Sequence, residues 1–150
     1  MDLAAHRRAL ERLYDAAPLH GRIPMRLEVG VATARVHFEA TADFHHAARS
    51  LHGSLLFKML DDAAFFAIAS EDDDVFAPTA RFEVEFLRPV GTGPLVADGR
   101  VTGAEGRRRT AEAEVRTSDG VVVARGRGEF SRGRTRWADA DLYDAGQRPI

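Results

Sequence analysis

The sequence has no cysteine among its 150 residues, and several other features are also missing. Without cysteine there is no thiolate nucleophile, no disulfide and no cysteine-bound zinc. No run of about 18 apolar residues is present that could cross a membrane, and the first 18 residues lack the apolar core of a signal peptide. The net charge of -2 lacks the basic excess of a nucleic-acid binder. We therefore expect a cytoplasmic protein that binds neither nucleic acid nor membranes.

The length and the hydrophobic content of 45% suit one domain over residues 1–150. We expect its core at about residues 22–132, preceded by an amphipathic helix at 2–16 whose start Asp2 can cap. The polar segment 133–150 is predicted to be a loose or partner-dependent tail. The apolar positions that recur at helical spacing near the N-terminus are Leu3, Leu10, Leu13 and Tyr14.

Alternating apolar and polar residues predict an antiparallel sheet in the rest of the chain. The first strand runs from about Met25 to Phe38, with a bulge or break near Thr33 because the alternation changes phase there. Short loops connect the later strands, and Ser118-Asp119-Gly120 is typical of a tight hairpin. These later strands are expected at about 79–88, 95–104, 110–117 and 121–131.

A second helix is predicted from the run LLFKMLDDAAFFAIAS, which begins at Leu55 and is apolar almost all round. Such a helix is normally buried inside a domain, and Ser54 is a plausible N-cap. An antiparallel sheet needs its apolar face covered, and this helix is the only element suited to that role. The pattern therefore predicts an α+β fold, with five to six strands curved around one long helix.

Two adjacent carboxylates, Asp61 and Asp62, interrupt this apolar helix. A buried ionised carboxylate is costly unless it is paired or hydrogen-bonded, so at least one should be exposed or retained for function. Lys58 lies four residues before Asp62, and a pair on the outer face would account for Asp62. Asp61 is left as the candidate functional carboxylate.

His52-Gly53-Ser54 precedes the same helix. A helix N-terminus offers free backbone N–H groups, and Gly53 would let a ligand carbonyl approach closely, although a plain turn and cap is the alternative. His45, His46 and His52 do not form a convincing metal site, because no further ligand lies at suitable spacing. No G-x-S-x-G motif is present for a serine nucleophile. The remaining histidines, His6, His20 and His37, are expected at the surface or partly packed.

Taken together, these residues resemble the hotdog-fold thioesterases of the phenylacetic acid degradation type, over about Arg26 to Ser131. That family has a loop ending in His-Gly-Gly, followed by an apolar helix with an acidic residue nine positions after the histidine. Here LHGSLLFKMLDDAAFFAI supplies His52, Gly53 and Asp61. A second hallmark, a strand ending in aromatic-apolar-x-Pro, is matched by Phe86-Leu87-Arg88-Pro89.

The resemblance implies a hotdog-fold acyl-CoA hydrolase that needs no cofactor, since CoA is part of the substrate. The Gly53 N–H would polarise the thioester carbonyl, and Asp61 would attack it or activate a water. Thr79 falls where some members place a hydroxyl that positions the water. Members are homodimers or dimers of dimers, in which the helix of one subunit and the loop of its neighbour share a site.

Two positions depart from the family pattern. His46 stands where many members have asparagine, and its imidazole can hydrogen-bond or act as a base. Ser54 replaces the second glycine and narrows the space beside the carbonyl. Arginines such as Arg88 suit the phosphates of CoA. The further residues expected at the substrate are His52, Ser54, Phe57, Phe65 and Phe82, although the phenylalanines could equally belong to the core.

Two alternatives to a thioesterase stay open. One is a hotdog enoyl-CoA hydratase or dehydratase, in which His46 would work with Asp61. The other is a non-catalytic protein that binds or senses acyl-CoA, although a sensor would usually carry a second domain.

Overall fold

The computed structural model describes residues 2–140, 142 and 143. Helix α1 occupies Leu3–Ala16, and the side chain of Asp2 caps it by accepting a hydrogen bond from the Ala5 N–H at 2.8 Å. A short 3-10 turn at Pro18–Gly21 follows, because proline cannot continue the α-helix. The buried face of α1 presents His6, Ala9, Leu10 and Tyr14.

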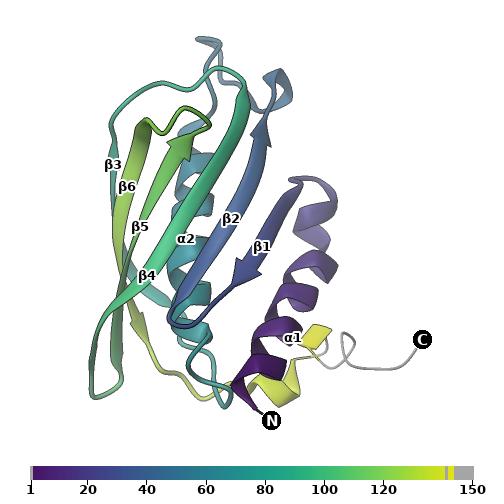
Figure 1. Ribbon diagram of the computed structural model, residues 1–150, viewed down its shortest axis with the longest axis vertical. Helices are drawn as coiled ribbons and strands as arrows, with labels where there is room; N and C mark the ends of the chain where they lie inside the picture. The colour runs from purple at the N-terminus through teal and green to yellow at the C-terminus, as the bar shows by residue number, and fades with distance from the viewer. Residues whose placement is uncertain (1, 141, 144–150) are drawn as a thin grey trace.

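Six antiparallel strands form one curved sheet in the order β1-β2-β4-β5-β6-β3, which confirms the predicted α+β hotdog arrangement (Figure 1). The neighbours β4, β5 and β6 are consecutive in the chain, as expected for strands joined by short connections. The strands are β1 (Met25–Val29), β2 (Thr33–Ala40), β3 (Thr79–Phe86), β4 (Gly93–Glu105), β5 (Arg108–Thr117) and β6 (Val122–Ser131).

Helix α2 (Gly53–Ala69) lies in the hollow of the sheet. Small residues let the two layers approach closely: a Cβ on Gly99 of β4 would overlap the carbonyl oxygen of Ala63. Met59 and Leu60 are fully buried between the layers. Each such side chain contributes roughly 1.5–3 kcal/mol to stability. The packing fixes which face of α2 turns toward the sheet and which is left for other contacts.

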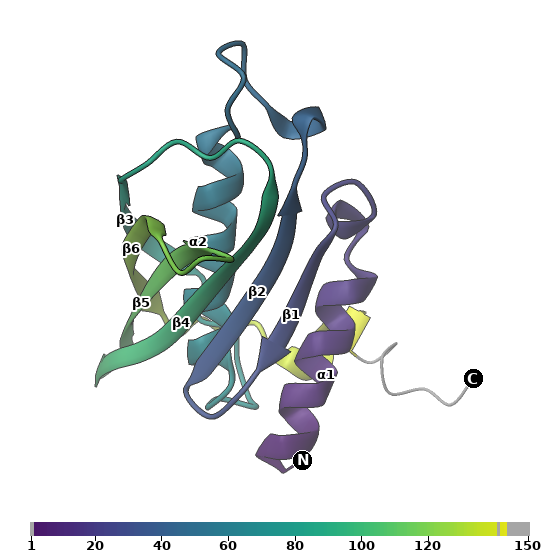
Figure 2. The ribbon, with the colours of Figure 1, turned by 45° about the horizontal axis from the view of Figure 1, so that its top comes forward.

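The two edges of the sheet differ. Helix α1 covers the edge at β1 (Figure 2), where Glu11 accepts a hydrogen bond from the Val29 N–H at 2.9 Å and Arg8 donates to the Val29 carbonyl at 2.6 Å. At the opposite edge β3 pairs only with β6, so its other side is open. Among the described residues, no helix combines the length and hydropathy needed to cross a membrane.

Three sequence predictions need correction. The strand expected at 25–38 does break near Thr33, as predicted, but its two parts pair as a hairpin, because Ala32 adopts a positive φ of 56° and reverses the chain. Helix α2 begins at Gly53, and His52 rather than Ser54 is its N-cap. The chain after Ser131 is not loose where it is described, since Trp137 is buried in the core.

The three histidines expected at the surface or partly packed behave differently. His6 is fully buried: its Nε2–H donates to the Ala69 carbonyl at 2.7 Å, and its Nδ1 bonds to the Tyr143 hydroxyl at 2.9 Å. His20 bonds to Lys58 at 2.9 Å, while His37 pairs with Glu28 on the outer face of the sheet. His6 lies four residues before Leu10 on the apolar face of α1, and this position explains its burial.

Candidate active site

Asp61 is half-buried in the third turn of α2 and faces β3. The hydroxyl of Thr79 donates a hydrogen bond to Oδ1 of Asp61 at 2.8 Å, which brings together two residues that the sequence placed at the site. Burial raises the pKa of the Asp61 carboxyl above its ordinary value. The Thr79 bond and the charge of Lys58 oppose this pKa rise, whereas the charge of Asp62 adds to it. Such a carboxylate is a stronger base than a fully solvated one.

Asp62 points away from Asp61, around the helix. Lys58 pairs with Asp62 at 2.5 Å, as the four-residue spacing predicted, but the pair is not on an open face. Its side chains are only 15% and 17% exposed, because Tyr14 of α1 covers them and donates a hydrogen bond to Asp62 at 2.7 Å. The two adjacent carboxylates therefore have different environments.

Toward its N-terminus, α2 meets aromatic side chains of β3. Phe57 packs edge-on against Phe82 with their ring centroids 5.6 Å apart. One turn earlier, the ring of Phe86 fills the space beside Gly53, since a Cβ added to Gly53 would lie 3.2 Å from it. Phe57 and Phe86 remain 40% and 58% exposed. These rings leave an apolar surface between the start of the helix and Asp61.

The N-terminus of α2 is held by His52. Its Nδ1 accepts hydrogen bonds from the Ser54 N–H at 3.1 Å and from the Ser54 hydroxyl at 2.7 Å. Because a backbone N–H can only donate, Nδ1 is unprotonated and the imidazole is neutral. The N–H of Gly53, in the first turn, has no acceptor within the helix. It is a donor suited to a ligand oxygen.

His46 lies in the loop before α2, beside His52, with a ring-centroid distance of 6.4 Å. Its Nδ1 accepts the Ala48 N–H at 3.0 Å, and the side chain is exposed. The structure thus brings His46 to the Gly53 end of the helix rather than to Asp61. Among the described residues, no three histidine, aspartate or glutamate side chains are grouped so that they could hold a metal ion.

Two further residues, Phe65 and Arg88, were also expected at the substrate. Phe65, one turn after Asp61, packs with Phe66, Phe130 and Trp137 at the edge of the core. Arg88 follows β3 and is exposed. Sequence reasoning missed Tyr14 and Phe86 as neighbours of the site. Tyr14 sits on the apolar face of α1, where helical spacing gave no sign that its hydroxyl would bond to Asp62.

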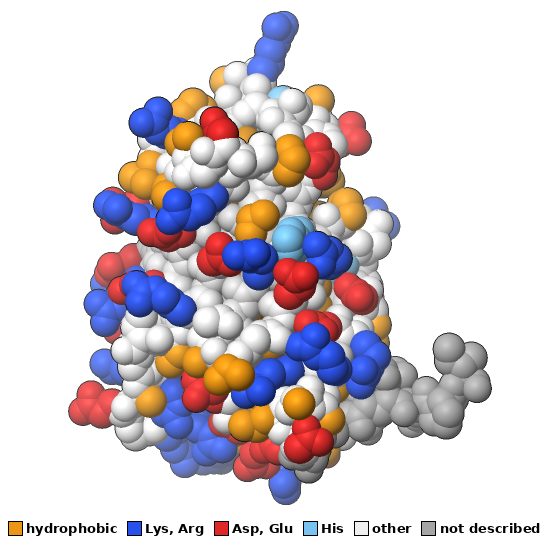
Figure 3. Space-filling model, viewed as in Figure 1, with side chains coloured by type: hydrophobic (Ala, Val, Ile, Leu, Met, Phe, Trp, Pro, Cys, Tyr) orange, Lys and Arg blue, Asp and Glu red, His pale blue; other side chains and the backbone are white. Residues whose placement is uncertain are grey.

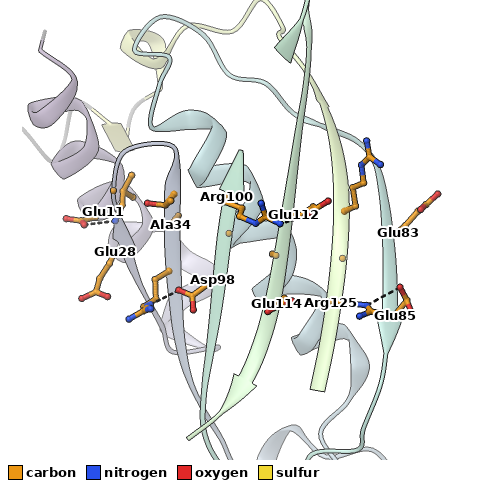
Figure 4. Close-up of a pocket in the computed structure, with 18 of the residues that line it drawn as sticks. Glu11, Glu28, Ala34, Glu83, Glu85, Asp98, Arg100, Glu112, Glu114 and Arg125 are labelled. Atoms are coloured by element: carbon orange, nitrogen blue, oxygen red, sulfur yellow. Dashed lines mark hydrogen bonds and ion pairs between the residues drawn. The ribbon is translucent and has the colours of Figure 1, made fainter. Parts of the chain in front are cut away.

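A hollow of about 1120 Å³ lies on the outer face of the sheet (Figure 4), and Asp61 is not among the residues that line it. Charged side chains of both signs line it and largely neutralise one another. Arg35 pairs with Asp98 at 2.7 Å, and Arg125 pairs with Glu85 at 3.2 Å. Figure 3 shows acidic and basic side chains intermixed over this face. The hollow therefore has the character of a solvated charged surface.

Comparisons with known proteins were made on the sequence and on the structure. A family model described as the thioesterase superfamily matches residues 48–124. No curated protein matches the chain. Many solved structures resemble this chain. The matches to three of them take in at least 94% of the residues of each of those structures.

The PaaI protein of the phenylacetic acid degradation operon of E. coli has a TM-score of 0.78 and 22% identity over 87% of this chain. A conserved protein of Pseudomonas aeruginosa has a TM-score of 0.72 and 26% identity over 78%. A mutant of the phenylacetic acid degradation protein PaaI of Thermus thermophilus has a TM-score of 0.70 and 23% identity over 78%. The match takes in 97% of the E. coli chain, 94% of the Pseudomonas chain and 100% of the Thermus chain.

Proposed function

Because this chain belongs to the thioesterase superfamily, as the match over residues 48–124 shows, we propose that it hydrolyses acyl-CoA thioesters with Asp61 as the catalytic carboxylate. The resemblance predicted from the sequence motifs is confirmed at the level of the superfamily. The observation that carries the proposal is the half-buried Asp61, raised in pKa and bonded to Thr79.

The chemistry requires one base and one oxyanion donor. Thr79 donates a hydrogen bond to Oδ1 of Asp61, and in this proposal Oδ2 acts on a water or attacks the thioester carbonyl itself. Addition of water, or of the carboxylate followed by water, gives the free acid and breaks the C–S bond. The CoA sulfur leaves as a thiolate, and because thiols are fairly acidic (the cysteine side chain has an ordinary pKa of about 8.5), no strong general acid is needed. Developing charge on the carbonyl oxygen calls for a donor such as the Gly53 N–H.

One copy of the chain does not provide both groups to the same carbonyl. Gly53 and Asp61 are eight residues apart on α2, so their backbones are about 12 Å apart along the helix axis. An oxyanion donor must lie about 3 Å from the carbonyl oxygen, and the base must be almost as close to the carbonyl carbon. This separation supports a site that combines Gly53 of one copy with Asp61 of another.

The open edge of β3 supports the same arrangement. In an antiparallel pair, residues that lie opposite each other point to the same face of the sheet. A twofold axis between two β3 strands must therefore set one residue opposite the same residue of the other copy, and we name each possible axis by that residue. An axis at Arg81 or at Glu83 would set that charged residue opposite its own copy. An axis at Val84 would set Glu83 of each copy opposite Glu85 of the other, which again pairs like charges. An axis at Phe82 instead sets Arg81 of each copy opposite Glu83 of the other. Charge complementarity therefore favours the axis at Phe82.

This axis also aligns the proposed catalytic groups. Phe57 contacts Phe82, so Phe57 lies at the level of the axis. Gly53 lies four residues before Phe57 on α2, and Asp61 lies four residues after it. The twofold rotation therefore brings Gly53 of one copy to the height of Asp61 of the other. Gly53 of one copy then faces Asp61 of the other. We propose a homodimer, or a dimer of such dimers, with two shared sites in which His46, His52 and Ser54 lie at the Gly53 end.

The test is hydrolysis of short-chain, medium-chain and aromatic acyl-CoAs, followed by free thiol release, for the wild type and Asp61→Asn. We expect turnover in the wild type and at least about a 100-fold lower kcat in the variant. Asp62→Asn, which changes the neighbouring carboxylate, is the matched control and should lose much less. Binding without turnover in the wild type would favour a sensor, and hydration of an enoyl-CoA a hydratase; either result would overturn the proposal.

A further inference from the structure

Four side chains from three elements meet around Asp62, and we call them the Asp62 cluster: Tyr14 of α1, His20 of the following 3-10 turn, and Lys58 and Asp62 of α2. Asp62 Oδ2 accepts hydrogen bonds from both Lys58 Nζ and the Tyr14 hydroxyl. The ring of Tyr14 stacks on His20 at a centroid distance of 3.8 Å, and Lys58 Nζ lies 5.2 Å from the centre of the Tyr14 ring. The cluster ties α1 to α2 beside the proposed site.

The hydrogen-bond geometry fixes the charges in the cluster. His20 Nδ1 lies 2.5 Å from the Tyr14 carbonyl, which can only accept, so this nitrogen carries the proton. In the neutral ring His20 Nε2 then accepts a hydrogen bond from Lys58 Nζ, which lies 2.9 Å away. Burial, followed by the charge of Asp62, raises the pKa of Tyr14, so the phenol stays protonated. One oxygen of the Asp62 carboxylate thus accepts two hydrogen bonds, one of them from the oppositely charged Lys58.

Asp61 is the next residue along the helix, yet it takes no part in this cluster; its hydrogen bond goes to Thr79. The charge of Asp62 raises the pKa of Asp61, and the charge of Lys58 lowers it. Because the site is only partly solvated, these charges act through a medium that screens less than water. The position and ionisation of Asp62 thus bear directly on the basicity of its neighbour.

We propose that Tyr14 holds the Lys58–Asp62 ion pair in place beside Asp61 as a positioning element, and that the balance of the two opposite charges in this pair tunes the proton affinity of Asp61. The proposal rests on the proposed role of Asp61 in hydrolysis. It makes α1 part of the machinery of the site rather than only a cover for the sheet edge. The charged and titratable groups that face Asp62 are Lys58 and Asp61 on α2, Tyr14 and the nearby Asp15 on α1, and His20 on the turn.

Two substitutions in the cluster should move Asp61 in opposite directions. Asp62→Asn keeps the shape but removes the negative charge, so the titration midpoint of Asp61 should fall by roughly half to one pH unit. Lys58→Met leaves Asp62 without its counter-charge, so the midpoint should rise by a similar amount. Lys58→Arg should restore it. A role limited to packing would not give opposite signs.

The experiment is a carboxyl-detected NMR titration of Asp61 in the full-length protein, together with the acid limb of kcat/KM against pH. Glu71→Gln, which removes an exposed carboxylate after α2, is the control and should change neither. The inference is overturned if Asp62→Asn leaves the Asp61 midpoint unchanged, or if both substitutions move it the same way.

Thermal denaturation checks that each variant is folded, and either variant alone tests the sign of its own shift. The NMR midpoint does not depend on turnover. A protein that hydrolyses no acyl-CoA but shows these shifts would therefore refute the proposed function and leave the electrostatic coupling standing. Turnover without these shifts would support the proposed function and refute the electrostatic coupling.

Discussion

The Thr79 hydroxyl donates a 2.8 Å hydrogen bond to Asp61 Oδ1, which ties the open edge strand of the sheet to the third turn of the central helix. The bond stabilises the charged form of a carboxylate that burial disfavours. It also fixes the orientation of the carboxylate relative to β3, the strand that we expect to meet a second copy.

Replacing Thr79 by valine should weaken catalysis and shift its pH dependence. Loss of a hydrogen bond to the anion raises the pKa of Asp61 further, so the acid limb of kcat/KM should move to higher pH. We expect about a 10-fold lower kcat from the less ordered carboxylate. Thr79→Ser keeps the hydroxyl and should behave like the wild type. An unchanged acid limb in Thr79→Val would contradict the role given to this bond.

Asp61→Asn should make the protein more stable at neutral pH while it lowers turnover. The folded pKa of Asp61 lies above its ordinary value of 3.8, so the folded state binds the proton more tightly than the unfolded state. The wild type therefore loses stability as pH rises from about 3.8 through the raised pKa, and the variant does not. At pH 7 we expect a Tm higher by about 2–4 °C. Asp62→Asn should lower Tm, because Lys58 and Tyr14 lose a charged partner.

Arg81→Glu should dissociate the proposed dimer, because it places a new carboxylate opposite Glu83 of the second copy at both ends of the pair. Sedimentation should show a larger monomer fraction at a given concentration, and specific activity should fall on dilution. Added salt should partly restore association by screening the repulsion. Arg100→Glu, on β4 away from the open edge, is the control. A monomeric wild type with full activity would refute the shared site.

His6 should make stability fall in mild acid. Burial lowers the pKa of His6 below its ordinary value of 6.5, so the folded state binds this proton less tightly than the unfolded state. Stability from the neutral ring is present above about pH 6.5 and is lost as pH falls toward the lowered pKa. Trp137, the single tryptophan, lies 5.7 Å from His6, so its fluorescence reports the change. His37→Gln should keep the transition, and His6→Phe should remove it.

Gly53→Ala separates two reasons for a glycine at the start of α2. The added methyl group would meet the exposed ring of Phe86, which can swing aside, so the protein should fold with little loss of stability. If the bare position serves the substrate carbonyl, kcat should fall at least about 10-fold and stay low in Gly53→Ala/Phe86→Ala. Recovery in the double variant would show that glycine is needed only to accommodate Phe86.

The sequence was informative where a pattern repeated over many residues. The apolar run after Ser54 predicted a buried helix, and alternation predicted the later strands to within a few residues. The hairpin at Val31 and Ala32 was predicted only as a bulge or break near Thr33, because neither Val31 nor Ala32 is a usual turn former. The burial of Trp137 was missed because it is a lone aromatic in a short polar segment that carries no periodicity.

The candidate site was only partly visible in the sequence. The spacing from His52 to Asp61 drew attention to α2, and Thr79, predicted at the same site, is hydrogen-bonded to Asp61. The contact of Tyr14 with Asp62 joins residues 48 positions apart in different helices, and no local pattern encodes such a pairing. The separation of Gly53 from Asp61 along one helix follows from elementary helix geometry. That this separation indicates a site shared between two copies could be inferred only once β3 was known to lie at the open edge of the sheet.

Because α1 covers β1, it determines at which edge the sheet can pair with a strand of another chain. With Val29 hydrogen-bonded to Glu11 and Arg8, one border of the sheet is closed to incoming strands, and only the β3 border can recruit another chain. Two copies joined through β3 would present a closed border at each end. Strand-by-strand polymerisation would then stop at a pair, which protects the protein from fibre formation by the same contact that fastens its N-terminal helix.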